Sequence, residues 1–124
     1  MIVGAVLGSP FIPYVQLMVR DAQGADRPIN LVVDTGFDGF LALPQTWVDG
    51  LSLTPLGTGS ITLSDKTSRE VLLYETVVVW DGQERSVPVY GLDGDPLVGT
   101  ALMYDYELTV QFVNGGTVFL RRMP

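Results

Sequence analysis

Residues 31–40 read LVVDTGFDGF, and in this stretch a carboxylate, Asp34, directly follows three apolar residues that are typical of a strand. An Asp at the end of a strand is often a turn residue whose side chain accepts backbone hydrogen bonds. It can also be placed for chemistry, because two carboxyl groups held close together share one proton, so that one acts as base and the other as acid. The stretch by itself leaves both interpretations of Asp34 open.

The residue types that the chain lacks narrow its possible chemistry. Among its 124 residues there is no Cys and no His, which excludes disulfides, Ser-His and Cys-His nucleophile pairs and the usual zinc ligand sets. Asp93-Gly94-Asp95 lacks the later ligands of a calcium loop, so the sequence predicts no metal and no cofactor. If the chain is an enzyme, carboxylates must carry its chemistry.

Charge and hydrophobicity narrow the possible partners. The net charge is -7 and the longest Lys/Arg cluster is Arg121-Arg122, which argues against a nucleic-acid partner. The opening residues MIVGAVLG are too short for a membrane span and lack the basic residues of a secretory signal, so we expect a soluble, cytoplasmic protein without a membrane partner. A hydrophobic content of 47% is high for a small acidic domain, and it indicates a buried subunit interface.

The pattern of residues predicts one all-β domain over residues 1–124. Short runs of Val, Leu, Thr, Tyr and Phe alternate with Gly, Pro, Asp and Asn, and no stretch of helical length keeps apolar residues at helical spacing. We expect short helical turns only at 46–51 and 100–104. Asn114-Gly115-Gly116 is typical of a β-hairpin turn, so we expect a hairpin there. Strands are predicted at 2–7, 14–20, 29–34, 41–43, 60–64, 70–80, 86–90, 107–113 and 117–121. The polar turn at 64–67 predicts a projecting hairpin that can act as a lid.

Four segments of the chain together resemble one protein family. Val33-Asp34-Thr35-Gly36 matches the signature of the aspartic proteases of the pepsin and retroviral protease superfamily, and the following Phe37 makes it similar to a prokaryotic single-domain group. Residues 61–66 with 74–79 resemble the family's flap hairpin, and residues 108–112 resemble the strand that closes its domain. Pro96-Leu97-Val98-Gly99 resembles the second signature, after which a short helix begins at Thr100. The resemblance covers residues 13–121, nearly the whole chain.

The resemblance implies a closed β-barrel of the retroviral aspartic protease type, with a flap hairpin and one short helix near the C-terminus. It also implies a homodimer in which Asp34 of each subunit lies at the two-fold axis, because the chain offers only one such carboxylate. The two Asp34 side chains would activate a water that hydrolyses a peptide bond of an extended substrate. Asp34 is therefore the predicted catalytic residue.

The resemblance also assigns roles to the residues around Asp34. Thr35 would hydrogen-bond across the dimer, and Gly36 would let the backbone approach the carboxylates. The bulky Phe37 either narrows the site or supports the loop from behind, and Asp38 is interpreted as a loop residue beside the cleft. The remaining assignments are Leu63, Ser64 and Asp65 for the flap and substrate contact, and Leu97, Val98 and Gly99 for packing behind the catalytic loop.

Two functions from different classes fit this sequence. The first is a homodimeric aspartic endopeptidase. The second is a catalytically silent β-barrel dimer that binds an extended peptide segment through the same groove, since a fold does not determine a function. The intact Asp34-Thr35-Gly36 favours the first.

Overall fold

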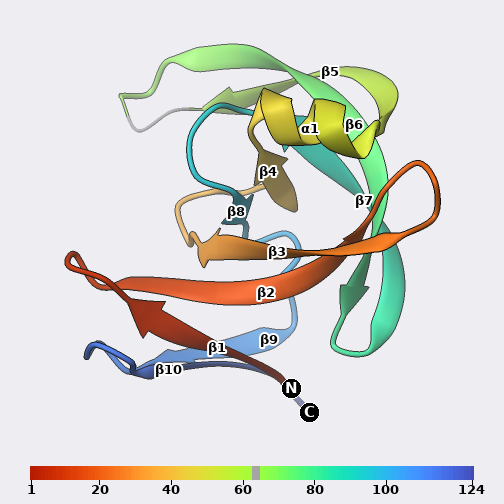
Figure 1. The fold of residues 1–124 in the computed structure, drawn as a ribbon. Coiled ribbons are helices and arrows are strands. Elements are labelled where there is room, and N and C mark those ends of the chain that lie inside the picture. Colours follow the sequence, from red (N-terminus) through yellow and green to blue (C-terminus); the bar gives the residue numbers. More distant parts are fainter. Residues whose placement is uncertain (63–64) are drawn as a thin grey trace.

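The computed structural model describes residues 1–62 and 65–124, and these consist mainly of β-strands (Figure 1). The strands are β1 (Ile2–Leu7), β2 (Ile12–Arg20), β3 (Asp26–Val33), β4 (Leu41–Leu43), β5 (Thr54–Thr62), β6 (Ser68–Trp80), β7 (Gln83–Gly91), β8 (Leu97–Val98), β9 (Tyr106–Val110) and β10 (Thr117–Arg122). Within the described residues the one helix is α1 (Gln45–Leu51). The prediction of an all-β chain is confirmed.

The strands join into one hydrogen-bonded sheet in the order β5-β6-β7-β4-β8-β3-β2-β1-β10-β9. A further antiparallel pairing joins β2 to β6, with Met18 opposite Val79 and Val19 opposite Val78. Strands β6, β7, β4, β8, β3 and β2 therefore form a ring, while β1, β10 and β9 continue the sheet beyond it (Figure 1). In this order β5 and β9 are the end strands.

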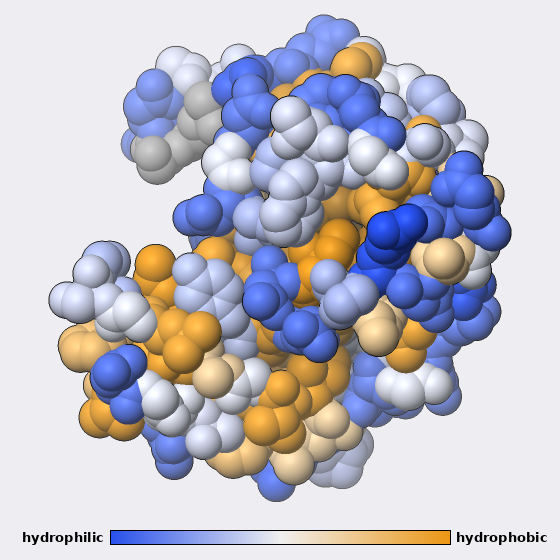
Figure 2. Space-filling model, viewed as in Figure 1, coloured by the Kyte–Doolittle hydropathy of each residue, from blue (hydrophilic) through white to orange (hydrophobic). Residues whose placement is uncertain are grey.

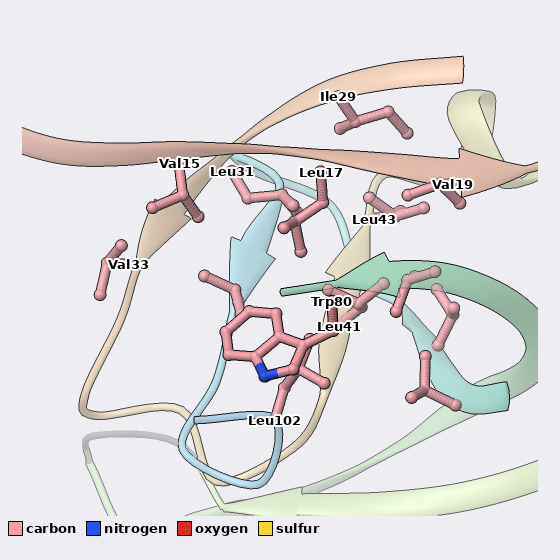
Figure 3. Packing of buried hydrophobic residues seen from close by; sticks show 14 of the residues in the cluster. Val15, Leu17, Val19, Ile29, Leu31, Val33, Leu41, Leu43, Trp80 and Leu102 are labelled. Atoms are coloured by element: carbon pink, nitrogen blue, oxygen red, sulfur yellow. The ribbon is translucent and has the colours of Figure 1, made fainter. Parts of the chain in front are cut away.

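The interior of the ring is filled by the apolar side chains that the alternating patterns predict. On β2, Val15, Leu17 and Val19 are buried, whereas Gln16 and Met18 between them are exposed. Figure 3 shows the same three residues packed with Ile29, Leu31 and Val33 of β3, and with Leu41, Leu43, Trp80 and Leu102. Burying one such aliphatic side chain stabilises a fold by about 1.5–3 kcal/mol. The apolar part of LVVDTGFDGF is thus fixed in the core, which determines where Asp34 emerges.

Most strand positions follow the predictions, and two elements do not. β5 begins at Thr54, well before the predicted start at residue 60, because its sequence TPLGTGSIT is largely exposed and shows no alternation. β8 contains only Leu97 and Val98, which is too short for a periodic pattern to reveal. The predicted hairpin at Asn114-Gly115-Gly116 is confirmed, with β9 and β10 antiparallel.

The predicted short helix near the C-terminus is wrong. Residues 100–104 form turns, in which the backbone N–H groups of Leu102 and Met103 donate to the Gly99 carbonyl at 3.2 and 3.3 Å. Asp105 then adopts a φ of 70°, outside the helical region, and β9 begins at the next residue. A single turn cannot propagate from this point. In the part of the chain that the structure describes, the helix is α1, which overlaps the helical turn predicted at 46–51.

Candidate active site

Asp34 leaves the core at the point where β3 runs parallel to β8. Val32 pairs with Leu97 and Val33 with Val98. The backbone N–H of Val32 donates to the Pro96 carbonyl at 2.8 Å, and that of Asp34 donates to the Val98 carbonyl at 3.0 Å. The segment that contains Asp-Thr-Gly and the segment that contains Leu-Val-Gly, about sixty residues apart in the chain, therefore lie side by side.

The carboxylate of Asp34 is only partly buried and is oriented by its own loop. Its Oδ1 accepts a hydrogen bond from the Gly36 backbone N–H at 2.8 Å, and the Phe37 N–H donates to the Asp34 carbonyl at 3.2 Å. A Cβ added at Gly36 would lie 3.2 Å from the same Oδ1. A small residue at position 36 thus lets the backbone come close to the carboxylate.

The segment after β8 holds the loop from behind by backbone hydrogen bonds. Gly99 N–H donates to the Phe40 carbonyl at 3.0 Å, Thr100 N–H to that of Phe37 at 2.9 Å, and Ala101 N–H to that of Gly39 at 3.2 Å. A Cβ at Gly99 would lie 2.2 Å from the Gly39 carbonyl oxygen and 2.7 Å from that of Phe37. The two segments approach so closely that only glycine fits at position 99 without displacing the backbone.

Phe37 lies beneath the loop and not on the open surface. Its side chain is 8% exposed, and its ring meets the ring of Tyr90 edge-on at 5.5 Å between centroids. A Cβ at Gly39 would lie 2.5 Å from the Phe37 ring, which shows that the ring fills the space under the loop. Of the two roles considered for Phe37, the geometry supports the second, support from behind.

The other predicted site residues occupy different surroundings. Thr35 and Asp38 are exposed. Asp65 is exposed in the turn of the β5–β6 hairpin, where its Oδ1 accepts hydrogen bonds from the Thr67 hydroxyl at 2.6 Å and the Thr67 N–H at 3.0 Å. The Thr67 hydroxyl is the main cause of a lowered pKa at Asp65. Leu63 and Ser64 lie outside the described residues.

The β3–β4 connection, which carries Asp34, lies on one side of the molecule between two projecting parts. Figure 1 shows the hairpin end of β5 and β6 above it and the β1–β2 turn below it, and Figure 2 shows this side hollowed between them. A separate cavity of about 810 Å³ is lined by Asp38, Phe40 and Thr100 together with Trp80 and Tyr106, but Asp34 does not line it. The hollowed side at the β3–β4 connection, and not this separate cavity, is the candidate active site.

The described residues offer no metal centre. Within 1–62 and 65–124, no three or more His, Cys, Asp or Glu side chains gather in a way that would hold a metal ion. Over the same ranges, no helix has the length and apolar character needed to cross a membrane.

Comparison with known proteins shows which solved structures share this fold. No protein-family model and no curated protein matches this sequence. Among solved structures, the chain is similar to EIAV protease in complex with the inhibitor HBY-793, with a TM-score of 0.60 and 16% identity over 76% of this chain and 86% of that one. It is also similar to a retropepsin-like aspartic protease from Rickettsia conorii, with a TM-score of 0.58 and 13% identity over 99% of this chain and 91% of that one.

The two structures define a class of fold, that of the aspartic proteases. More narrowly, the chain has the retropepsin-like fold, so the resemblance to the pepsin and retroviral protease superfamily is confirmed at the level of the fold. Identities of 13 and 16% say nothing further about activity.

Several residues that shape the site gave little signal in the sequence. Tyr90, against which Phe37 packs, stands near the end of a strand predicted only from its composition. The Thr100 hydroxyl, 3.4 Å from the Phe37 carbonyl, belongs to the segment that was predicted to be a helix. Among the residues behind the Asp34 loop, the sequence pointed only to Gly99, which follows two apolar residues.

Proposed function

We propose that this protein is a homodimeric aspartic endopeptidase in which Asp34 of each copy contributes one carboxylate to a shared catalytic pair. The observation that carries the proposal is the setting of Asp34. In a retropepsin-like fold, it is the carboxylate that emerges from a buried strand, and the Gly99 segment holds its loop from behind. Asp38, the other acid of the stretch, is exposed beyond the buried Phe37 and lines a different cavity. A second Asp34 is therefore the better partner.

The chemistry needs one ionised and one protonated carboxyl group. The ionised Asp34 takes a proton from a water whose oxygen attacks the carbonyl carbon of the scissile amide, while the protonated Asp34 gives its proton to the carbonyl oxygen. When the C–N bond breaks, the carboxyl group that took the water's proton gives it to the leaving nitrogen. The other carboxylate takes back the hydroxyl proton of the tetrahedral intermediate, so that the free carboxylic acid forms and the pair is restored. The Gly36 N–H at 2.8 Å would hold each carboxylate in the required orientation, and Thr35 would hydrogen-bond across the dimer.

The rest of the fold has a part in the same proposal. The ring of strands would act as a closed barrel, and residues 1–124 as one protease domain. The hairpin of β5 and β6 would be the flap that covers an extended peptide, with Leu63, Ser64 and Asp65 near the substrate. Leu97, Val98 and Gly99 would fix the catalytic loop.

One observation favours a second candidate, a catalytically silent dimer that binds an extended peptide. The bond from Gly36 N–H to Asp34 Oδ1 joins residues two apart, which is also what a purely structural turn Asp makes. In that case the hollowed side at the β3–β4 connection would bind peptide without cleaving it.

Cleavage of an unstructured protein separates the two candidates. Casein is incubated from acid to neutral pH with the wild type, Asp34→Asn and Asp38→Asn. Asn keeps an oxygen that can accept the Gly36 N–H, so Asp34→Asn should fold normally and lose cleavage by about 10²–10⁴-fold. Equal cleavage by wild type and Asp34→Asn would exclude Asp34 as the catalyst. Loss of cleavage in Asp38→Asn alone would place the second carboxylate within one chain, and no cleavage by wild type at any pH would favour the silent dimer.

A further inference from the structure

One corner of the sheet carries no charged side chain, although the N-terminal ammonium group of Met1 lies at its border and pairs with Asp81. The chain has 7 Lys and Arg and 14 Asp and Glu, yet none of them lies in residues 1–19 or 108–120. In the structure these two segments come together as β1, most of β2, the end of β9 and most of β10, which are neighbours in the sheet. In a chain of net charge -7, such a large uncharged region needs an explanation.

Within this region the end of β1 and the two loops at the same end of the strands expose large apolar side chains. Leu7 is 52% exposed, Phe11 48%, Phe112 63% and Val113 60%, and we call these four residues the tip patch. The loops lie next to each other, because Val6 N–H donates to the Gly116 carbonyl at 2.8 Å and Gly115 N–H donates to the Val6 carbonyl at 2.9 Å. Figure 2 shows hydrophobic side chains gathered at the lower left, where Figure 1 places these loops.

The tip patch lies on the same side of the molecule as Asp34. Tyr14 pairs with Val32 and Val15 with Leu31, so the start of β2 lies beside the end of β3 from which Asp34 emerges. Figure 1 shows the β1–β2 turn, the β9–β10 loop and the β3–β4 connection all on the left. Any copy that brings its own Asp34 up to this one must therefore also approach the tip patch.

We propose that the tip patch is the apolar centre of the contact between two copies of this chain, an inference that rests on the proposed function. A two-fold axis near Asp34 makes each surface meet its own counterpart, so the contact must be self-complementary. Two copies that each carry a charge of -7 repel each other, and an uncharged face is where this repulsion costs least. The surrounding uncharged residues of β1 and β10 would complete an interface of ordinary size, about 800 Å² on each copy.

The sheet order sets how this contact is made. β1 is already paired on both sides, with β2 and β10, and β10 is paired with β1 and β9. Most of β10 is paired on both edges, and β1 is unpaired only where residues 2–4 lie beyond its pairing with β2. Neither strand therefore has a full free edge for pairing with a partner's sheet. The contact is made by side chains of the two loops. The one alternative in this region is edge pairing by β9, the end strand of the sheet.

The test is to place a charge in the tip patch. Sedimentation velocity at micromolar concentration compares the wild type, Phe112→Asp, Val113→Asp and a matched control, Trp47→Asp. Trp47 is an aromatic residue, 42% exposed, in the first turn of α1, where an acid is tolerated. We expect a dimer for the wild type and the control, and at least about tenfold weaker dimerisation for both patch variants, because each would bury an unpaired charge. Circular dichroism should show all four folded.

The outcomes separate this inference from the proposed function. If both patch variants dimerise as strongly as the wild type, the tip patch is not the dimer contact. Pairing through the β9 edge predicts this result, which would leave the peptidase proposal intact. Asp34→Asn should remain dimeric while losing cleavage. A wild type that dimerises through the patch but cleaves nothing would contradict only the peptidase, whereas a wild type that is strictly monomeric would contradict both.

Discussion

Two loops of this molecule begin with an Asp that makes the same local bond in very different surroundings. Asp21 follows β2 and accepts the Gln23 N–H at 3.0 Å, just as Asp34 follows β3 and accepts the Gly36 N–H at 2.8 Å. Asp21 is buried, and its carboxylate also accepts the Ala25 N–H at 2.9 Å and pairs with Arg27 at 3.0 Å. Asp34 is partly exposed, and it begins the β3–β4 connection, which lies on the hollowed side of the molecule.

The difference shows that the local bond alone does not reveal a role. The carboxylate of Asp21 holds its own loop together through several partners. The loop of Asp34 is held instead by other groups, namely the Phe37 ring and the Gly99 segment behind it. Because the Asp34 side chain is not needed to hold its loop, it is available for chemistry. The predictions below test whether Asp21 stabilises its loop while the Asp34 loop is stabilised by other groups, from the largest expected effect to the smallest.

The largest effect is expected from removing the support beneath the Asp34 loop. Phe37→Ala deletes a buried aromatic ring and should lower the free energy of unfolding by about 3–5 kcal/mol. Urea denaturation measures this change, and Phe37→Leu, which keeps most of the volume, should cost much less. A cost below about 1 kcal/mol for Phe37→Ala, by the same scale, would mean that the ring does not support the loop.

A slightly smaller loss is expected from forcing the two segments apart. Gly99→Ala places a Cβ 2.2 Å from the Gly39 carbonyl oxygen, and backbone must move, so we expect a loss of about 3 kcal/mol together with weaker cleavage. Gly50→Ala is the matched control, since a Cβ there meets nothing within 4 Å. Because Gly50 lies within α1, and alanine favours a helix more than glycine does, this control variant should keep its stability or gain slightly. Equal stability of the two variants would contradict the close approach at Gly99.

Asp21 should contribute to the free energy of unfolding in a pH-dependent way and should have no effect on peptide cleavage. Backbone hydrogen bonding from Ala25, followed by the pairing with Arg27, lowers the pKa of Asp21. Its carboxylate therefore stabilises the fold above the ordinary pKa of an Asp, and this contribution is lost as the pH falls through the lower, folded-state pKa.

Asp21→Asn should accordingly have a lower urea midpoint than the wild type at neutral pH, and the two midpoints should converge in acid. Its cleavage of casein per folded molecule should match that of the wild type. A difference in midpoint that stays constant down to strongly acid pH would show that the charge of Asp21 is not what stabilises the loop.

The smallest effect is expected in the hairpin turn, where the contacts are local and exposed. Thr67→Val removes the hydroxyl that is the main cause of the lowered pKa of Asp65. The pKa of Asp65 should rise towards its ordinary value, as an NMR titration of its carboxyl carbon would show, with no measurable change in the urea midpoint. A clear loss of global stability would mean that this turn is more than a local structure.

The sequence was sufficient for the strands that alternate, and it singled out the two segments, around Asp34 and Gly99, that the structure brings side by side. β2 shows its buried face in the sequence, and Gly99 after two apolar residues marked the segment behind Asp34. The first part of β5, residues 54–59, escaped prediction because it is exposed and interrupted by Pro55, Gly57 and Gly59, and β8 escaped because it has only two residues. The helix that the resemblance implied after Thr100 is only a turn, and Asp105, which follows this turn, lies in the left-handed region. The high hydrophobic content of the sequence indicated a subunit interface. Only the structure shows which apolar side chains are exposed and that they lie together at one end of the sheet.

The most direct test of the central claim is to mix subunits. Wild-type protein and folded, dimeric Asp34→Asn are combined in equal amounts under conditions of subunit exchange, and casein cleavage is measured at constant total protein. If each active site needs one Asp34 from each copy, only dimers of two wild-type chains cleave, and activity falls to about a quarter of that of wild type alone. A fall to only about a half would show that each chain works independently, and would contradict the shared pair.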